Sequence, residues 1–236
     1  MSGTRRWAAA GLLLVVAGVL TAISTARHWA ICRADPASLR CLALQDATHG
    51  FPGWGGLGRP DLGTAAAGIV AALLLSVAWV GVIGWARGSG TRNLLCVVVG
   101  VQPLIAATVL VIEATGFVLP AAVGGWLTWP AEAYVFPFLL GAGWLVNESL
   151  LGTLRLLTLG WGVTSFGSIH HVADSVVARL LSPDAVGASP PGLGYATAAT
   201  QVLVGLVVVV LTLQRAVPDT PDTDDGPERD GFTLAA

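Results

Sequence analysis

Four long apolar runs, with one charged residue among them, constrain this chain more than any other feature of its sequence. They cover residues 7–25, 63–86, 93–114 and 196–213. A helix rises 1.5 Å per residue, so about 20 apolar residues cross the ~30 Å hydrocarbon core of a bilayer. The sequence therefore predicts an all-α, polytopic transmembrane helix bundle. A cleaved signal peptide is the alternative for the first run.

The overall composition supports a membrane protein. Charged residues make up 11% of the chain, whereas soluble domains have about a quarter. The net charge is −2, and the sequence has no basic patch and no phosphate-binding loop, so we expect neither nucleic acid nor nucleotide as a partner. All twelve basic residues are Arg, which is typical of a GC-rich bacterial genome. We expect the plasma membrane as the location.

The region 116–167 is apolar but is interrupted by prolines. Pro130 suits the first turn of a helix, where the backbone N–H groups lack partners in any case. We predict a fourth span at 129–147 and a fifth at 149–166, which contains Arg155. The chain would then have about six spans in a single bundle, residues 1–214. The acidic tail, 215–236, is predicted to be disordered and cytoplasmic.

The segment 168–181 has the pattern of an amphipathic helix. One face collects apolar side chains and the other collects polar ones. The apolar face holds Ile169, Val172, Val176 and Leu180, and the polar face holds His170, His171 and Asp174. Such a helix is predicted to lie in the outer interface of the membrane.

Two cysteines decide the predicted orientation. Cys32 and Cys41 lie nine positions apart in the polar loop 27–62, and an oxidising exterior would join them as a disulfide. A redox role would need a second cysteine pair, but the remaining Cys96 stands alone in an apolar run. The Arg residues divide almost evenly between the two sides, so they decide weakly. We therefore place loops 27–62 and 168–194 outside and both termini in the cytoplasm.

Histidines and carboxylates gather on the predicted outer side and are candidate metal ligands. His170 and Asp174 are spaced i, i+4, so one helix face could present both to a divalent transition metal. The candidate metal ligands are His49, His170, His171 and Asp174. The alternative is that these side chains face water. No other cofactor is indicated.

Two glutamates are candidate catalytic residues. Glu113 lies near the outer end of the third span, and Glu132 opens the fourth at a similar depth. Ionisable residues in a membrane are costly and are functional candidates for that reason. The pair could act as acid and base on a lipid or isoprenoid substrate. The alternative is that both side chains extend to the membrane interface.

The leading functional expectation is a non-enzymatic accessory or small-molecule-handling membrane component with a disulfide-braced outer face. The alternatives are the intramembrane enzyme with paired carboxylates and the outer-face metal binder. Expected partners are the lipid bilayer and either another membrane protein or a second copy of the chain. Small residues at every fourth position, such as Gly18, Ala22 and Ala26, would allow helices to approach closely.

Overall fold

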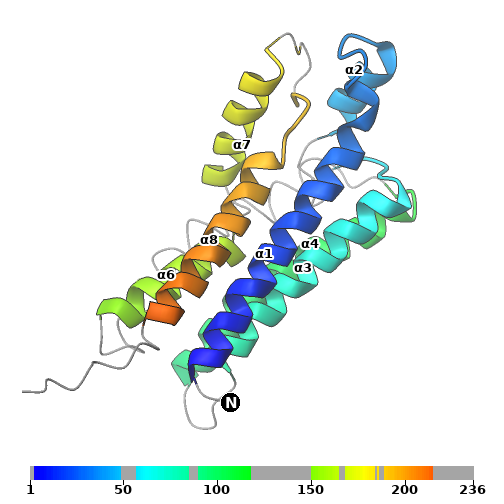
Figure 1. Ribbon diagram of the computed structural model, residues 1–236. Coiled ribbons are helices and arrows are strands. Elements are labelled where there is room, and N and C mark those ends of the chain that lie inside the picture. Colours follow the sequence, from blue (N-terminus) through cyan, green and yellow to red (C-terminus); the bar gives the residue numbers. More distant parts are fainter. Residues whose placement is uncertain are drawn as a thin grey trace, which may run out of the picture.

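Every regular element that the structure describes is a helix (Figure 1). The computed structural model describes residues 3–48, 57–84, 90–117, 150–164, 168–183, 185 and 189–214. Its helices are α1 (Gly3–His28), η1 (Trp29–Cys32), α2 (Leu39–Ala47), α3 (Leu62–Ile83), α4 (Gly90–Ala114), α6 (Leu150–Val163), α7 (Ser168–Leu181) and α8 (Tyr195–Gln214). No strand occurs in these residues.

Four of these helices, α1, α3, α4 and α8, are long and apolar enough to cross a membrane. They correspond to the four apolar runs, so this part of the prediction is confirmed. The first apolar helix continues through η1, and the candidate span Thr4–Cys32 has 29 residues. That length exceeds the roughly 20 residues that a bilayer core needs, so the helix tilts or projects beyond the core.

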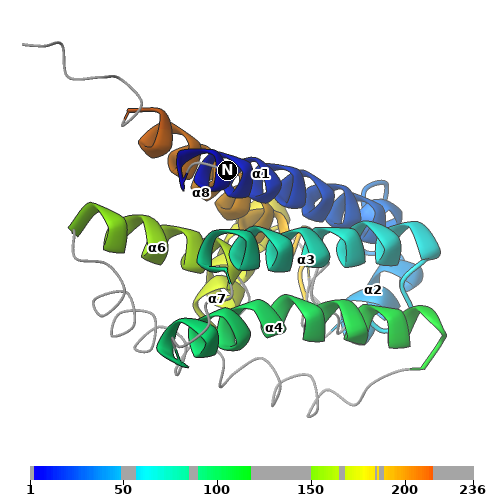
Figure 2. The same ribbon diagram turned by 90° about the horizontal axis from the view of Figure 1, so that it is seen from below.

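Helix α1 lies between α8 and α3, and α4 packs on the far side of α3 (Figures 1 and 2). Glycines bring α1 and α8 unusually close. A Cβ on Gly11 would lie 2.7 Å from the carbonyl oxygen of Gly205, and a Cβ on Gly18 would lie 2.8 Å from that of Ala198. Small residues at a helix interface allow this approach of two backbones.

Helices α6 and α7 run antiparallel to α8. Figure 1 shows α6 beside the C-terminal half of α8 and α7 beside its beginning. Accordingly, Arg155 contacts Leu211, whereas Asp174 contacts residues 194–197. The predicted fifth span, 149–166, is represented by the 14 residues of α6. The predicted fourth span and the acidic tail lie outside the described residues.

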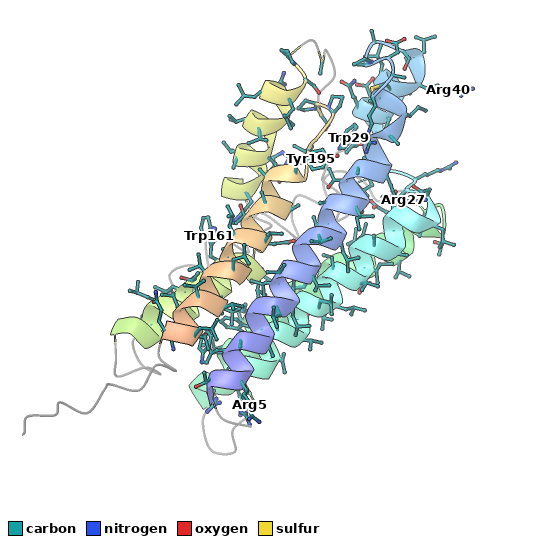
Figure 3. All side chains as sticks on the ribbon, in the orientation of Figure 1. Arg5, Arg27, Trp29, Arg40, Trp161 and Tyr195 are labelled. Carbon is teal, nitrogen blue, oxygen red and sulfur yellow. A yellow bond between two sulfur atoms is a disulfide. The ribbon has the colours of Figure 1, made fainter. Side chains whose placement is uncertain are left out.

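The two ends of the bundle differ in what they carry. We call the end with Cys32 and Cys41 the disulfide end. It holds the last turns of α1 and α4, the first turns of α3 and α8, and η1 and α2. Figure 3 shows Arg27, Trp29, Arg40 and Tyr195 toward this end and Arg5 at the opposite one.

Helix α7 covers the predicted segment 168–181, but the structure does not confirm the predicted apolar and polar faces, because His171 is exposed beside Val172. Val172, Val176 and Leu180 are exposed, whereas His170 and Asp174 are buried. The expectation that these two polar side chains face water is wrong. They are buried because α7 turns this face toward α8, whose first turn supplies hydrogen-bond donors.

Candidate functional site

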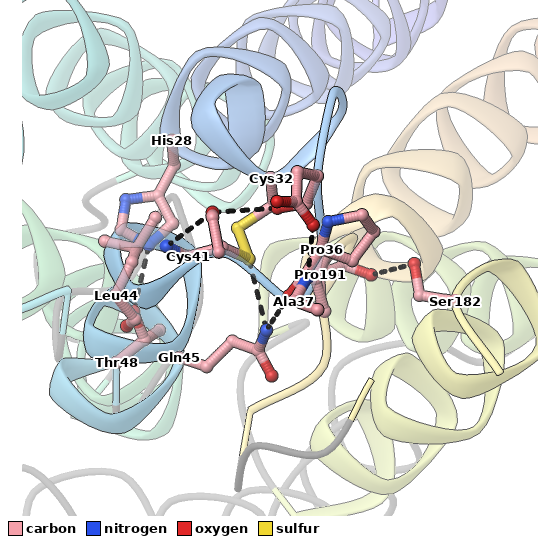
Figure 4. Close-up of a disulfide and its surroundings, with 12 residues drawn as sticks. His28, Cys32, Pro36, Ala37, Cys41, Leu44, Gln45, Thr48, Ser182 and Pro191 are labelled. Atoms are coloured by element: carbon pink, nitrogen blue, oxygen red, sulfur yellow. Dashed lines mark hydrogen bonds between the residues drawn. A yellow bond between two sulfur atoms is a disulfide. The ribbon is translucent and has the colours of Figure 1, made fainter. Parts of the chain in front are cut away.

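The disulfide braces the loop 27–62. Cys32 and Cys41 form the expected bond, and both are almost completely buried. Helix α2 begins at the cap Ser38, whose Oγ accepts the N–H of Cys41 at 3.3 Å. Gln45 Nε2 donates to Cys41 Sγ at 3.1 Å and to the carbonyl oxygen of Pro36 at 3.4 Å (Figure 4). The segment from Cys32 to Cys41 is thus covalently closed, and hydrogen bonds hold α2 against it.

A short segment between α7 and α8 ties this unit to the rest of the bundle. We call residues 189–194 the strap; all six are buried. Ser189 Oγ donates to the carbonyl oxygen of Thr48, which ends α2. Trp29 Nε1 donates to the carbonyl oxygen of Leu193 at 3.0 Å. The two segments predicted to form the outer face, 27–62 and 168–194, therefore contact each other directly.

Asp174 caps the beginning of α8 from the neighbouring helix. Its Oδ1 accepts the N–H groups of Gly194 at 3.1 Å, Ala196 at 2.7 Å and Thr197 at 3.2 Å. Its Oδ2 accepts the hydroxyl of Thr197. These four donors favour the anionic form of the carboxyl group. The helix macrodipole also favours a negative charge here.

Asp61 caps α3 at the same end of the bundle. Its carboxylate accepts the N–H groups of Gly63 at 2.9 Å and Thr64 at 3.2 Å, and Arg27 Nη2 pairs with it at 3.0 Å. The pKa of Asp61 is lowered to about 2, mainly by the hydrogen bond from the Thr64 hydroxyl and further by the other donors. A Cβ on Gly63 would lie 2.5 Å from Arg27 Nη2, so a larger residue there would displace the guanidinium from its present position.

Glu113 holds the chain that leads into α3. This side chain is buried at the end of α4, and its Oε2 accepts the N–H of Leu57 at 3.3 Å. Its predicted position near the disulfide end is therefore correct. Glu132, its proposed catalytic partner, lies outside the described residues, so the structure does not bring the two together.

At the opposite end of the bundle, arginines contact the last turns of the two helices whose first turns are capped by aspartates. Arg155 of α6 donates from Nη2 to the carbonyl oxygen of Leu211 in the last turn of α8. Arg92 donates from Nε to the carbonyl oxygen of Ile83, the last residue of α3. Helix C-termini carry unpaired carbonyl groups and a partial negative charge, which cations satisfy. Both α3 and α8 thus have an aspartate at the first turn and an arginine at the last.

The candidate metal ligands do not form a cluster among the described residues. No group of three or more His, Cys, Asp and Glu side chains there could hold a metal ion. His170 is buried, and the centroid of its ring lies 4.5 Å from the ring centroid of Trp161. His171 is exposed on the other side of α7. His49 lies outside the described residues.

A stripe of buried polar side chains runs inward from the disulfide end, and the sequence reasoning missed it. Thr21 Oγ1 hydrogen-bonds Gln201 Oε1 at 2.9 Å, and Ser24 Oγ donates to the carbonyl oxygen of Thr64 at 2.8 Å. The signal was present as hydroxyl and amide residues at i, i+3 and i+4 within apolar runs. We call this stripe the polar seam; its members are Thr21, Ser24, Thr25, Thr197 and Gln201, each at most 1% exposed.

An apolar groove of about 570 Å³ lies between α3 and α4 and is lined by residues of these two helices. Ser76 and Cys96 are its more polar lining residues, and the Ser76 hydroxyl already donates to the carbonyl oxygen of Gly100. The groove therefore offers van der Waals contact and little hydrogen bonding.

Comparisons with known proteins assign no family to this arrangement. The chain matches no protein-family model, no curated protein and no solved structure.

Proposed function

We propose that the chain is a non-enzymatic component of the plasma membrane whose outer end is a rigid, disulfide-braced platform built from residues 27–62 and 182–194, the segment that follows α7. The proposal rests on the hydrogen bonds that the buried and capping carboxylates make. Asp61, Asp174 and Glu113 each accept backbone N–H groups. A catalytic acid or a metal ligand directs its oxygens at a substrate or an ion, whereas these three hold helix ends and a loop in place.

The disulfide supports the disulfide end as the outer one, because disulfide bonds persist in an oxidising exterior and are rare in the cytoplasm. The arginines do not decide the orientation, since four of them lie in the loop 27–62 and Arg5 and Arg6 are exposed at the opposite end. In the proposed topology both termini are cytoplasmic.

The proposed topology has six crossings, with α6 and α7 together forming the fifth. This revises the earlier interpretation of 168–181 as a helix lying in the interface. The support is the antiparallel run of α6 and α7 along α8, from Arg155 beside Leu211 to Asp174 beside Thr197. Phe117 follows α4 at the disulfide end, whereas Leu150 begins α6 toward the opposite end. One further crossing between these two residues completes the count.

A complementation experiment tests the non-enzymatic role. Glu113→Gln keeps an oxygen that can accept the Leu57 N–H but removes any acid or base function. In a host lacking the native gene, we expect this variant to restore the phenotype in proportion to its abundance in the membrane. Glu113→Ala, which removes the acceptor, should lower the abundance itself.

Normal abundance of Glu113→Gln together with complete loss of complementation would contradict the proposal and favour the intramembrane enzyme. Stoichiometric metal in protein purified without added metal would favour the metal binder instead. Thiol labelling of single cysteines placed at residues 37 and 90 of intact cells tests the orientation. Only the first should react from outside.

A further inference from the structure

The strap is held in place by single polar contacts from three directions. Thr48 anchors it from α2, Trp29 from η1, and Asp174 from α7. Ser182, directly after α7, adds a bond to the carbonyl oxygen of Pro191 at 3.3 Å. Each of these contacts joins one side chain to one backbone group. The bonds to Thr48, Trp29 and Ser182 join uncharged groups, so each contributes little net stability. The bond to Asp174 is stronger, because its acceptor is a carboxylate.

The strap can move as a unit. Pro190 and Pro191 fix their own φ angles and stiffen its middle. Gly192 and Gly194 follow with φ of 97° and 110°, conformations in which glycine rotates freely and other residues do not. Rotation at these two glycines would lift residues 189–191 without unwinding α8, which begins at Tyr195.

The polar seam begins directly beneath the strap. Thr25 lies one helical turn before the anchor Trp29, and Thr197 lies three residues after Gly194. The Thr25 hydroxyl donates only to its own helix, to the carbonyl oxygen of Thr21 at 2.8 Å. The opposite half of the α1–α8 interface packs closely at Gly11 and Gly205, and Thr212 is its buried hydroxyl residue. Polar side chains inside a membrane are costly, and those that line a path for water are the usual exception.

We propose that the strap is a removable plug, and that its release admits water and small uncharged polar solutes to the polar seam from the disulfide end. The seam's own side chains are uncharged hydroxyl and amide groups, and the carboxylate beside it, Asp174, is already bonded to Thr197 and to backbone N–H groups, so the seam suits uncharged solutes. The plug does not depend on the non-enzymatic role proposed above, because an enzyme or a carrier could use the same opening.

Two buried threonines provide a matched pair of reporters. Thr25 and Thr212 are both at most 1% exposed, and each hydroxyl bonds only a carbonyl oxygen of its own helix. Thr25 lies under the strap, and Thr212 lies in the last turn of α8 at the opposite end. Each is changed to Cys in a Cys96→Ser background, in full-length protein in nanodiscs. The probe is a charged, water-soluble methanethiosulfonate, which needs water at the thiol.

The strap is loosened with the double variant Trp29→Phe and Ser189→Ala, which removes two anchors and keeps the aromatic ring. We expect Thr25→Cys to react slowly under the native strap and at least tenfold faster under the loosened one. Thr212→Cys should not change. Equal rates for Thr25→Cys under both straps, or an equal rise for Thr212→Cys, would overturn the plug.

Hydrogen exchange in the unaltered chain covers the case in which the loosened variant does not fold. Spontaneous release of the strap should let the buried amides of residues 192–193 exchange at least tenfold faster than those of residues 205–208. Equal, slow exchange in both segments would overturn the proposal.

Discussion

The two halves of α1 solve the same packing problem in different ways. Toward the opposite end, Ala10, Leu14 and Ala17 are buried among apolar side chains, and Gly11 lets α8 approach until the backbones touch. Toward the disulfide end, Thr21 and Ser24 hydrogen-bond neighbouring helices. Lipid is as apolar as leucine, so helices in a membrane associate through close packing or polar bonds rather than through a hydrophobic gain. This bundle packs α1 closely against α8 in both halves, at Gly11 and at Gly18, and adds polar bonds toward the disulfide end.

The largest effect should come from breaking the polar half at Asp174. Asp174→Ala leaves the N–H groups of Gly194, Ala196 and Thr197 without their acceptor. We expect the free energy of unfolding to fall by about 3 kcal/mol, because bonds to a charged group contribute about 1.5–3 kcal/mol each. Chemical denaturation in detergent measures the change. Asp174→Asn is the control; its remaining oxygen can accept the same N–H groups, so a loss as large as that of Asp174→Ala would contradict the capping role.

Removing the disulfide should be the next largest effect. Cys32→Ser with Cys41→Ser opens a loop with a sequence separation of 9. Closing a loop of this size stabilises by about 2.5 kcal/mol through the entropy of the unfolded chain. The midpoint of thermal unfolding should fall accordingly. Because both sulfurs are buried, a reductant added to native protein should leave the midpoint unchanged, and rapid reduction without unfolding would show that the brace is open to solvent.

The apolar half is tested at Gly205. A Cβ there would lie 2.6 Å from the carbonyl oxygen of Gly11, and a backbone cannot move aside as a side chain can. We expect Gly205→Ala to lower the free energy of unfolding by about 2 kcal/mol, a typical cost of overpacking. Gly81→Ala is the matched control, because its Cβ would meet no atom within 4 Å. It should be neutral or should stabilise by up to about 1 kcal/mol through helix propensity.

The smallest effect is the pH dependence that Asp61 contributes. Its pKa is lowered to about 2 from an ordinary 3.8, so its stabilisation is present above pH 3.8 and is lost as the pH falls through about 2. The carboxylate is half exposed, and the effect is correspondingly small. The thermal midpoints of the wild type and Asp61→Asn should differ at pH 6 and converge near pH 2. A constant difference across this range would exclude ionisation of Asp61 as the cause.

The sequence was sufficient for the spans because a run of about 20 apolar residues has few other solutions. It was also sufficient for the pairing of Cys32 with Cys41. It failed for Asp174, because periodicity identifies the polar face of a helix but not the neighbour that covers it. A signal was available in α8. The residue before Tyr195 is Gly194, so α8 lacks a capping side chain of its own and needs an acceptor from elsewhere.

The catalytic and metal interpretations of the carboxylates came from residue type and approximate depth alone. Glu113 is at the predicted end, but the N–H of Leu57 that it accepts belongs to a loop 56 positions away. Contacts at such separations depend on how the helices are arranged, which a single sequence does not reveal. The polar seam was missed for the same reason, since Thr21 and Gln201 are 180 positions apart.

The capping of α8 by α6 and α7 has a consequence for biosynthesis. Arg155 and Asp174 both have partners in residues 194–211, which leave the ribosome later. Until then, each charge opposes entry of its segment into lipid by roughly 2.5–3.5 kcal/mol. We therefore expect α6 and α7 to wait near the translocon and to partition into the bilayer together with α8, as one helical hairpin.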